Sequence, residues 1–312
     1  MNGREGAVCV FELPPRAKSI VVESVCGRKM ILAPGDVFLG TAGHRESTRW
    51  VVGGVPKRGL VPGTVYWVLA ECGVVGEFRG ESPLQKSHVG EATYVGSIAG
   101  SDGRALNIDQ FVAVADARPP GRQPPVLLIV GTSAEVGKTT AGSVVLRSLK
   151  SRGARSITAL KATGTSSLAE LAVYRDYGAT RVFDCVDFGL PTTYPTGRRG
   201  MEEFFSRALD TCLSFPADGI VIECGGDLLG GNVPVFLGCL KQRRADAKVI
   251  LAAADAFGAA GAKRMLEEDA GLSVTLITGP CTDTPTLRER TVAMCGVPAI
   301  NMSGGSDKDV PF

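Results

Sequence analysis

Apolar residues in the C-terminal part of the chain occur in two patterns that follow one another repeatedly. Short continuous apolar runs indicate strands that are buried on both faces. Between them, residues such as Met201, Phe204, Phe205 and Ala208 recur at the i, i+3, i+4 and i+7 spacing of one helix face. The alternation predicts an α/β fold with a doubly wound, mostly parallel sheet. The predicted strands are residues 126–130, 156–160, 181–183, 219–222, 249–251, 274–277 and 298–300.

Residues 1–117 have a different pattern, in which short alternating stretches are separated by glycine, proline, aspartate and serine. This pattern predicts a smaller β-rich domain ahead of the α/β domain. Residues 118–125 contain four prolines, which exclude a helix or a central strand and predict a stiff linker. The α/β domain is then expected to span residues 126–302, and residues 303–312 to form a flexible tail.

The first strand of the α/β domain leads into a loop that reads Gly-Thr-Ser-Ala-Glu-Val-Gly-Lys-Thr-Thr. Glycine lets backbone N–H groups approach phosphate oxygens, and the following helix adds unpaired N–H groups and its positive dipole end. Lys138 can reach the β- and γ-phosphates, and the Thr139 hydroxyl can meet Mg²⁺. The motif predicts a P-loop NTPase domain with ATP and Mg²⁺ as cofactors. The residues expected to bind the nucleotide here are Gly131, Thr132, Ser133, Ala134, Glu135, Val136, Gly137, Lys138, Thr139 and Thr140.

The loop has five residues between Gly131 and Gly137, one more than the common pattern, and Thr132 stands at the usual first-glycine position. This form resembles the loop of dethiobiotin synthetases and of cobyrinic acid a,c-diamide synthase-type enzymes. The resemblance implies an ATP-dependent ligase or small-molecule kinase that phosphorylates a carboxylate for ligation or cyclisation. Ser133 occupies the position of the signature lysine found in partitioning ATPases and nitrogenase iron proteins, which argues against that group.

Two more charged residues follow predicted strands, at the edge where parallel sheets bind ligands. Lys161 follows the strand 156–160, and the synthetase resemblance implies that it meets the substrate and the transferred phosphate, although a strand-end lysine can also simply face solvent. Glu223 ends an apolar strand and resembles the Mg²⁺-holding second motif of phosphate-loop enzymes, with Cys224 in place of a synthetase glycine. Lys138, Lys161 and Glu223 are therefore the expected catalytic residues, and Thr139 and Glu223 the expected metal ligands.

Four polar residues after other strands are weaker candidates. Asp184 and Asp187 could also hold Mg²⁺, although carboxylates at strand ends are equally ordinary helix caps. Thr278 and Asn301 follow the last two predicted strands, where proteins of the resembled families contact adenine. They are expected to bind the base of the nucleotide.

A second resemblance covers about residues 126–302. The segments 162–165, 184–188 and 223–228 are similar, in that order, to a poorly characterised bacterial family with some members identified as D-glutamate N-acetyltransferases. This likeness makes acyl transfer to an amino acid an alternative function. A third alternative is a nucleotide-switched chaperone or scaffold ATPase, against which the missing signature lysine and the lack of a paired-cysteine motif both count.

The composition of the chain limits the kinds of partner that we expect. The chain has 312 residues and a net charge of +2, which favours neither nucleic acid nor an acidic membrane surface. No apolar run is as long as a membrane span, and no signal peptide is apparent at the N-terminus. The nine cysteines are scattered, as in a reducing compartment. We therefore expect a cytoplasmic enzyme that acts on a small carboxylate or amino acid and forms a homodimer. The β-rich domain is expected to supply substrate contacts or a dimer surface.

Overall fold

The computed structural model describes residues 2–47, 49–83, 89–112, 123–194 and 198–303. The chain divides into two compact units, of which the first is Met1–Ala113, Gly164–Ala169 and Asp184–Thr196. The second unit is Val114–Thr163, Glu170–Phe183 and Gly197–Phe312. Two segments from the predicted α/β domain therefore group with the N-terminal residues. The predicted linker and tail lie mostly outside the described residues.

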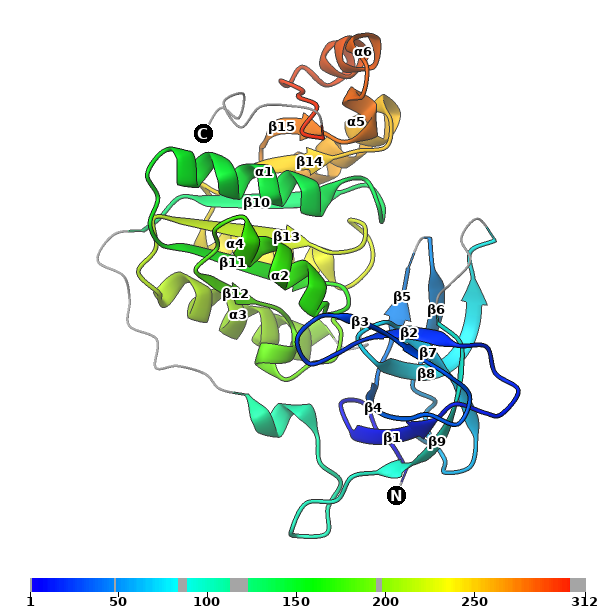
Figure 1. Cartoon of the computed structure of the whole chain (residues 1–312). Helices are drawn as coiled ribbons and strands as arrows, with labels where there is room; N and C mark the ends of the chain where they lie inside the picture. Colours follow the sequence, from blue (N-terminus) through cyan, green and yellow to red (C-terminus); the bar gives the residue numbers. More distant parts are fainter. Residues whose placement is uncertain (1, 48, 84–88, 113–122, 195–197, 304–312) are drawn as a thin grey trace. The chain divides into compact units, whose positions relative to one another are not determined.

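The first unit contains a seven-stranded sheet and the separate hairpin β2–β3, so the prediction of a β-rich part is confirmed (Figure 1). The sheet order is β4-β1-β9-β7-β8-β6-β5. A parallel pairing between β4 and β8 joins the two ends of the first five strands, which closes them into a ring. The elements are β1 Val8–Glu12, β2 Ile20–Glu23, β3 Lys29–Leu32, β4 Val37–Ala42, β5 Arg45–Glu46, β6 Val51–Gly54, β7 Val65–Ala70, β8 Val74–Glu81, β9 Glu91–Ser97, and the short helices η1 Ile108–Phe111 and η2 Val186–Phe188.

The core of this unit comes from alternate strand positions, because successive side chains of a strand point to opposite faces. Cys9 and Phe11 of β1 are fully buried, whereas Val8 and Val10 are partly exposed and Glu12 is exposed. The Phe11 ring lies 5.6 Å from that of Phe38 and 5.5 Å from that of Tyr94, measured between ring centroids. The first unit thus has an aromatic core of its own.

The second unit is built on six parallel strands in the order β12-β11-β13-β10-β14-β15. Its central strands are buried at every position, which explains their continuous apolar runs. The predicted α/β fold with a parallel sheet is confirmed. The elements are β10 Val126–Gly131, α1 Lys138–Ser151, β11 Ile157–Thr163, α2 Leu168–Asp176, β12 Arg181–Phe183, α3 Arg198–Ser214, β13 Gly219–Cys224, α4 Val233–Arg243, β14 Lys248–Ala252, α5 Ala256–Arg264, η3 Met265–Asp269, β15 Val274–Thr278, η4 Pro280–Thr282 and α6 Pro285–Cys295.

The strand order reverses between β10 and β13. From β10 the chain runs through α1 and α2 toward β12, whereas from β12 it runs through β13 and α4 back toward β15. Because such crossovers are right-handed, α1 and α2 cover one face of the sheet and α3, α4 and α5 the other. The point of reversal lies between β10 and β13, and ligands bind at the carboxyl ends of such strands in this class of sheet.

One predicted strand is wrong. Residues 298–300 form only a single bridge, between Ile277 and Ala299. The N–H groups of Ile277 and Ile300 donate to Pro298 O and Ile277 O, each at 2.9 Å. Proline has no N–H group of its own, so the pairing does not extend into a ladder.

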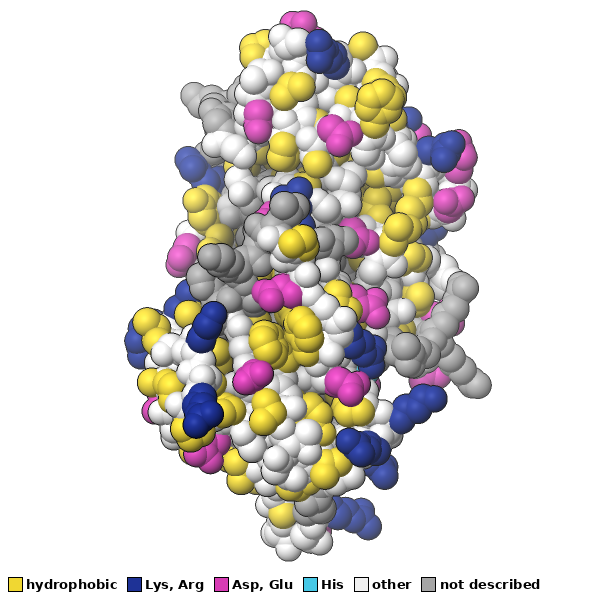
Figure 2. Space-filling model, turned by 90° about the vertical axis from the view of Figure 1, so that its right-hand side faces the viewer, with side chains coloured by type: hydrophobic (Ala, Val, Ile, Leu, Met, Phe, Trp, Pro, Cys, Tyr) yellow, Lys and Arg dark blue, Asp and Glu magenta, His cyan; other side chains and the backbone are white. Residues whose placement is uncertain are grey.

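The surface drawn in Figure 2 has basic and acidic side chains interspersed among apolar ones, in keeping with the small net charge. Among the described residues, every helix is too short or too polar to cross a membrane.

Candidate nucleotide-binding site

The phosphate loop joins the end of β10 to the start of α1. Gly137 precedes the helix with a φ of 86°, in the left-handed region that other residues rarely adopt. Glu135 also has a positive φ, 62°, which is unusual for a residue with a side chain. Two such residues within one short loop curve its backbone, and Lys138 then begins α1 directly.

Thr132 anchors the first half of the loop to β14. Its N–H donates to Ala252 O at 3.0 Å, and its Oγ1 accepts the N–H of Ala254 at 3.3 Å. A glycine at this position could make only the first of these bonds. The structure therefore explains why a threonine stands where the common motif has its first glycine.

Lys138 lies across the loop. Its side chain is buried, and its Nζ donates to Ser133 O at 2.7 Å. Burial lowers the pKa of Lys138, while the nearby Glu223 carboxylate opposes that effect. Its ammonium therefore lies against the backbone of the loop that precedes it, the position expected of a lysine that binds phosphate. Thr140, in the same helical turn, is exposed.

Glu223 lies near the end of β13, opposite Ile129 of β10, and is 3% exposed. Each of its carboxylate oxygens accepts one hydroxyl. Thr139 Oγ1 donates to Oε1 at 3.3 Å, and the Tyr174 hydroxyl donates to Oε2. Burial raises the pKa of Glu223, and the Glu170 carboxylate raises it further. β13 continues in extended form through Cys224, so the cysteine does not interrupt the strand.

Lys161 is the strand neighbour of Glu223, since the two residues are paired in the β11–β13 register. Its ammonium is buried and forms an ion pair with Glu170 of α2. The structure therefore brings Lys138, Thr139, Lys161 and Glu223 to the carboxyl ends of three adjacent strands.

Sequence reasoning missed two residues of this site, Glu170 and Tyr174. Both lie on α2 at i and i+4, so they share one face of that helix. Their spacing is that of one helix face, which the sequence shows, but neither residue follows a strand directly. A polar pair at helical spacing after a strand-end lysine is the signal that could have found them.

Asp184 and Asp187 belong to the first unit. Asp184 Oδ1 accepts the N–H of Val186, and Asp187 Oδ2 accepts the N–H of Asp184, each at 2.8 Å. These two bonds hold the turn that leads from β12 into η2. Their role as metal ligands stays a prediction. Within the described ranges, no three His, Cys, Asp or Glu side chains form a group that could hold a metal ion.

Thr278 and Asn301 hold the chain after β15. Thr278 Oγ1 accepts the N–H of Met302 at 3.4 Å, and Asn301 Oδ1 accepts the N–H of Ser303 at 2.8 Å. The Asn301 amide also lies 3.5 Å from Asp283 Oδ1. Their contact with the base stays a prediction.

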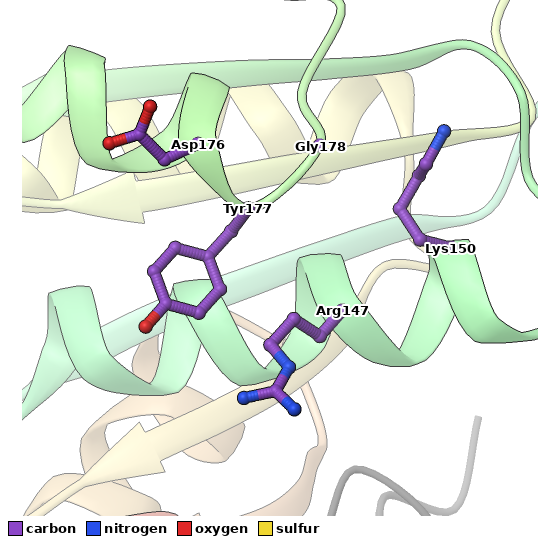
Figure 3. Close-up of a pocket in the computed structure, with 5 residues that line it drawn as sticks. All are labelled: Arg147, Lys150, Asp176, Tyr177 and Gly178. Carbon is purple, nitrogen blue, oxygen red and sulfur yellow. The ribbon is translucent and has the colours of Figure 1, made fainter.

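A separate pocket of about 460 Å³ lies between the C-terminal ends of α1 and α2 (Figure 3). It is lined by Arg147, Lys150, Asp176, Tyr177 and Gly178. Lys150 lies twelve residues after Lys138 in α1, which corresponds to about 18 Å along the helix axis. The pocket is therefore distinct from the phosphate loop.

Comparison with known proteins gives fold-level likeness only. No protein-family model matches the chain, and no curated protein matches it. The signal recognition particle receptor FtsY from Elizabethkingia anophelis is 16% identical, with a TM-score of 0.43 over 67% of this chain and 71% of that one. FtsY from Thermotoga maritima is 18% identical, with a TM-score of 0.40 over 66% of this chain and 71% of that one. Chloroplast FtsY from Physcomitrella patens is 17% identical, with a TM-score of 0.42 over 66% of this chain and 67% of that one.

These neighbours contradict the predicted ATP-dependent ligase or small-molecule kinase, because the Elizabethkingia protein is a signal recognition particle receptor and the other two are FtsY proteins as well. We withdraw that prediction, together with the acyl-transfer alternative and the predicted partner, a small carboxylate or amino acid. These neighbours do not overturn the alternative of a nucleotide-switched protein. The resemblance to dethiobiotin synthetases and acetyltransferases likewise finds no support. TM-scores below 0.5 transfer no partner and no base specificity to this chain. What stands is the P-loop NTPase fold, and binding of nucleotide and Mg²⁺ by the residues described above stays a prediction.

Proposed function

We propose that this chain is a Mg²⁺-dependent nucleoside triphosphatase that hydrolyses its nucleotide at the phosphate loop. The observation that carries the proposal is the convergence of Thr139 and Glu223, whose Oγ1 and Oε1 atoms are 3.3 Å apart directly behind the loop. One residue comes from the start of α1 and the other from β13, so the pair exists only in the folded sheet.

The loop and Lys138 bind the phosphates in this proposal. The first N–H groups of α1 have no helical partners and add the positive end of the helix dipole. The Lys138 ammonium already contacts the loop backbone at Ser133 O. A triphosphate in the loop therefore meets backbone donors and a buried cation together.

The residues present fit Mg²⁺, a hard cation that takes oxygen ligands and keeps several of them from phosphates and water. Thr139 and Glu223 would hold it. When bound, Mg²⁺ supplies positive charge that neutralises the β- and γ-phosphate oxygens. Burial of Glu223 in a site with two lysines makes its charge effective at short range.

Lys161 supplies a second ammonium. In the ion pair with Glu170 its charge is matched by a carboxylate. A γ-phosphate competes for the same ammonium, and its oxygens gain negative charge during transfer. We infer that Lys161 exchanges Glu170 for the phosphoryl group and stabilises it in the transition state.

The first test is nucleotide binding by Lys138→Ala, with Lys150→Ala as a matched control. Both changes remove a lysine from α1, but Lys150 lines the distant pocket. We expect Lys138→Ala to lose about tenfold to a hundredfold in affinity, because charge-assisted bonds to phosphate are lost. Lys150→Ala should bind like the wild type. Calorimetric titrations with GTP and with ATP, each with Mg²⁺, measure both affinities and identify the base.

The proposal fails if the wild type binds neither nucleotide, or if Lys138→Ala and Lys150→Ala bind equally well. The rate of phosphate release should also be lower in Lys138→Ala than in Lys150→Ala and the wild type. A wild type that binds nucleotide without any turnover would reduce the proposal to nucleotide binding alone.

A further inference from the structure

Tyr174 places a hydroxyl group in the hydrophobic core of the second unit. Its side chain is 1% exposed and packs in a cluster with Leu127, Ala141, Val145 and Val221. A hydroxyl in such surroundings is unfavourable unless it forms a hydrogen bond. A phenylalanine would fill nearly the same space without that requirement. The hydroxyl therefore needs a partner, and that partner is Glu223 Oε2.

The backbone of α1 leaves room for this hydroxyl. At Gly142, a Cβ atom would lie 2.8 Å from the Tyr174 hydroxyl oxygen and 2.9 Å from its Cε1. Any larger residue at this helix position would displace the ring. Glycine costs an α-helix about 0.5–1 kcal/mol relative to alanine, so the close approach is maintained against helix propensity. The tyrosine is thus confined between α1 and β13.

Two hydroxyls from different helices fix the Glu223 carboxylate. Thr139 of α1 donates to Oε1, and Tyr174 of α2 donates to Oε2. With one oxygen held on each side, the plane of the carboxylate is set. Hydrogen-bond partners that hold a metal ligand in this way affect metal affinity although they do not touch the metal.

We propose that Tyr174 is a positioning residue for Glu223: it holds Oε2 so that Oε1 stays beside Thr139, where Mg²⁺ binds with the nucleotide. This inference rests on the proposed nucleotide and metal site. It makes α2 a structural part of that site. The alternative is that Tyr174 serves only core packing.

The test compares Tyr174→Phe with Tyr177→Phe. Each variant loses one phenolic hydroxyl, and Tyr177 directly follows α2 and lines the surface pocket. Two quantities are measured for the nucleotide that the wild type binds: its affinity in EDTA, and the affinity of the nucleotide complex for Mn²⁺ by electron paramagnetic resonance. Urea unfolding accompanies each variant.

We expect Tyr174→Phe to bind Mn²⁺ about ten to a hundred times more weakly, the usual effect of losing such a partner. Its metal-free nucleotide affinity should stay within about twofold of the wild type, because the loop and Lys138 are unchanged. Tyr177→Phe should match the wild type in both. Equal Mn²⁺ affinity in Tyr174→Phe would overturn the proposal, as would a parallel loss of metal-free nucleotide affinity.

Two further variants keep the test decisive. In Glu223→Gln the carboxylate is absent, so adding Tyr174→Phe should weaken Mn²⁺ binding no further. Additive losses would contradict action through Glu223. Gly142→Ala crowds the same hydroxyl from α1 and should weaken Mn²⁺ binding in the same direction, independently of whether Tyr174→Phe folds. A wild type without metal-dependent nucleotide binding would instead overturn the proposed function itself.

Discussion

Among the single residues, Glu223 shows how the carboxylate proposed to hold Mg²⁺ affects stability. It is a buried carboxylate with two hydroxyl donors, one strand away from Lys161. Replacement by glutamine keeps the size of the side chain and removes its charge. We expect Glu223→Gln to lower the rate of nucleotide hydrolysis by about tenfold to a thousandfold, because one electrostatic stabiliser is lost. The measurement is turnover over a Mg²⁺ titration, and an unchanged curve would give Glu223 a purely structural role.

The same substitution has a pH signature in stability. Burial raises the pKa of Glu223 above its usual value of 4.5, so the folded state holds its proton more tightly than the unfolded chain does. Such a group favours folding below pH 4.5, and this contribution is lost as pH rises through the folded pKa. Because glutamine does not titrate, the stability of Glu223→Gln does not fall in this way as pH rises. Its free energy of unfolding, relative to wild type, should therefore increase from acidic to neutral pH.

Urea unfolding in EDTA at several pH values measures this difference without metal. A difference that stays constant with pH would contradict the assignment of Glu223 as a group whose pKa folding raises. Substituting a functional carboxylate is then expected to trade activity for stability.

At the scale of the helices, two glycines allow a matched comparison. Gly142 in α1 and Gly238 in α4 both lie inside helices. A Cβ at Gly238 would meet nothing within 4 Å, whereas one at Gly142 would meet Tyr174 at 2.8 Å. Gly238→Ala should therefore stabilise the protein by about 0.5–1 kcal/mol through helix propensity alone. Gly142→Ala should destabilise it by about 1–3 kcal/mol through overpacking.

Denaturant midpoints of the two variants give both values. If Gly142→Ala stabilised the protein as much as Gly238→Ala, the ring of Tyr174 would not be confined between α1 and β13. The positioning argument for that residue would then lose its geometric basis.

At the scale of the whole molecule, each unit has its own hydrophobic core. Phe11, Tyr94 and Val68 belong to the core of the first unit, and Leu127, Val145 and Val221 to that of the second. The phosphate loop and Glu223 lie in the second unit. We expect saturating Mg²⁺ and nucleotide to stabilise the transition of this unit by about 2.7 kcal/mol at a hundred times Kd.

Scanning calorimetry with and without nucleotide measures this stabilisation, and Lys138→Ala should largely abolish it. A transition of the first unit that is resolved from the second should not move. Equal stabilisation of wild type and Lys138→Ala would place the bound nucleotide away from the loop.

Elements that depend on a local residue pattern are predictable from the amino-acid sequence. The parallel sheet follows from continuous apolar runs separated by helical spacing, and the phosphate loop from glycines placed between a strand and a helix. The motif and the predicted strands also place Lys138, Thr139, Lys161 and Glu223 at the carboxyl edge of the sheet, where ligands bind, and their roles there stay a prediction. The carboxylate acceptor could not be predicted, because the loop motif specifies binding of phosphate and contains no information about a second substrate. The neighbours contradicted that prediction.

The side chains that surround Glu223 and Lys161 are visible only in the folded structure. Tyr174 and Glu223 are 49 residues apart, and their contact depends on where α2 crosses the sheet and on the space at Gly142. The pairing of Lys161 with Glu170 likewise depends on which face α2 turns toward β11. Periodicity along the chain predicts that a helix has a buried face. It does not predict which residues of other elements pack against that face. Such contacts follow from packing between elements, so the sequence pattern predicts the strand-end residues and not the helix residues that hold them.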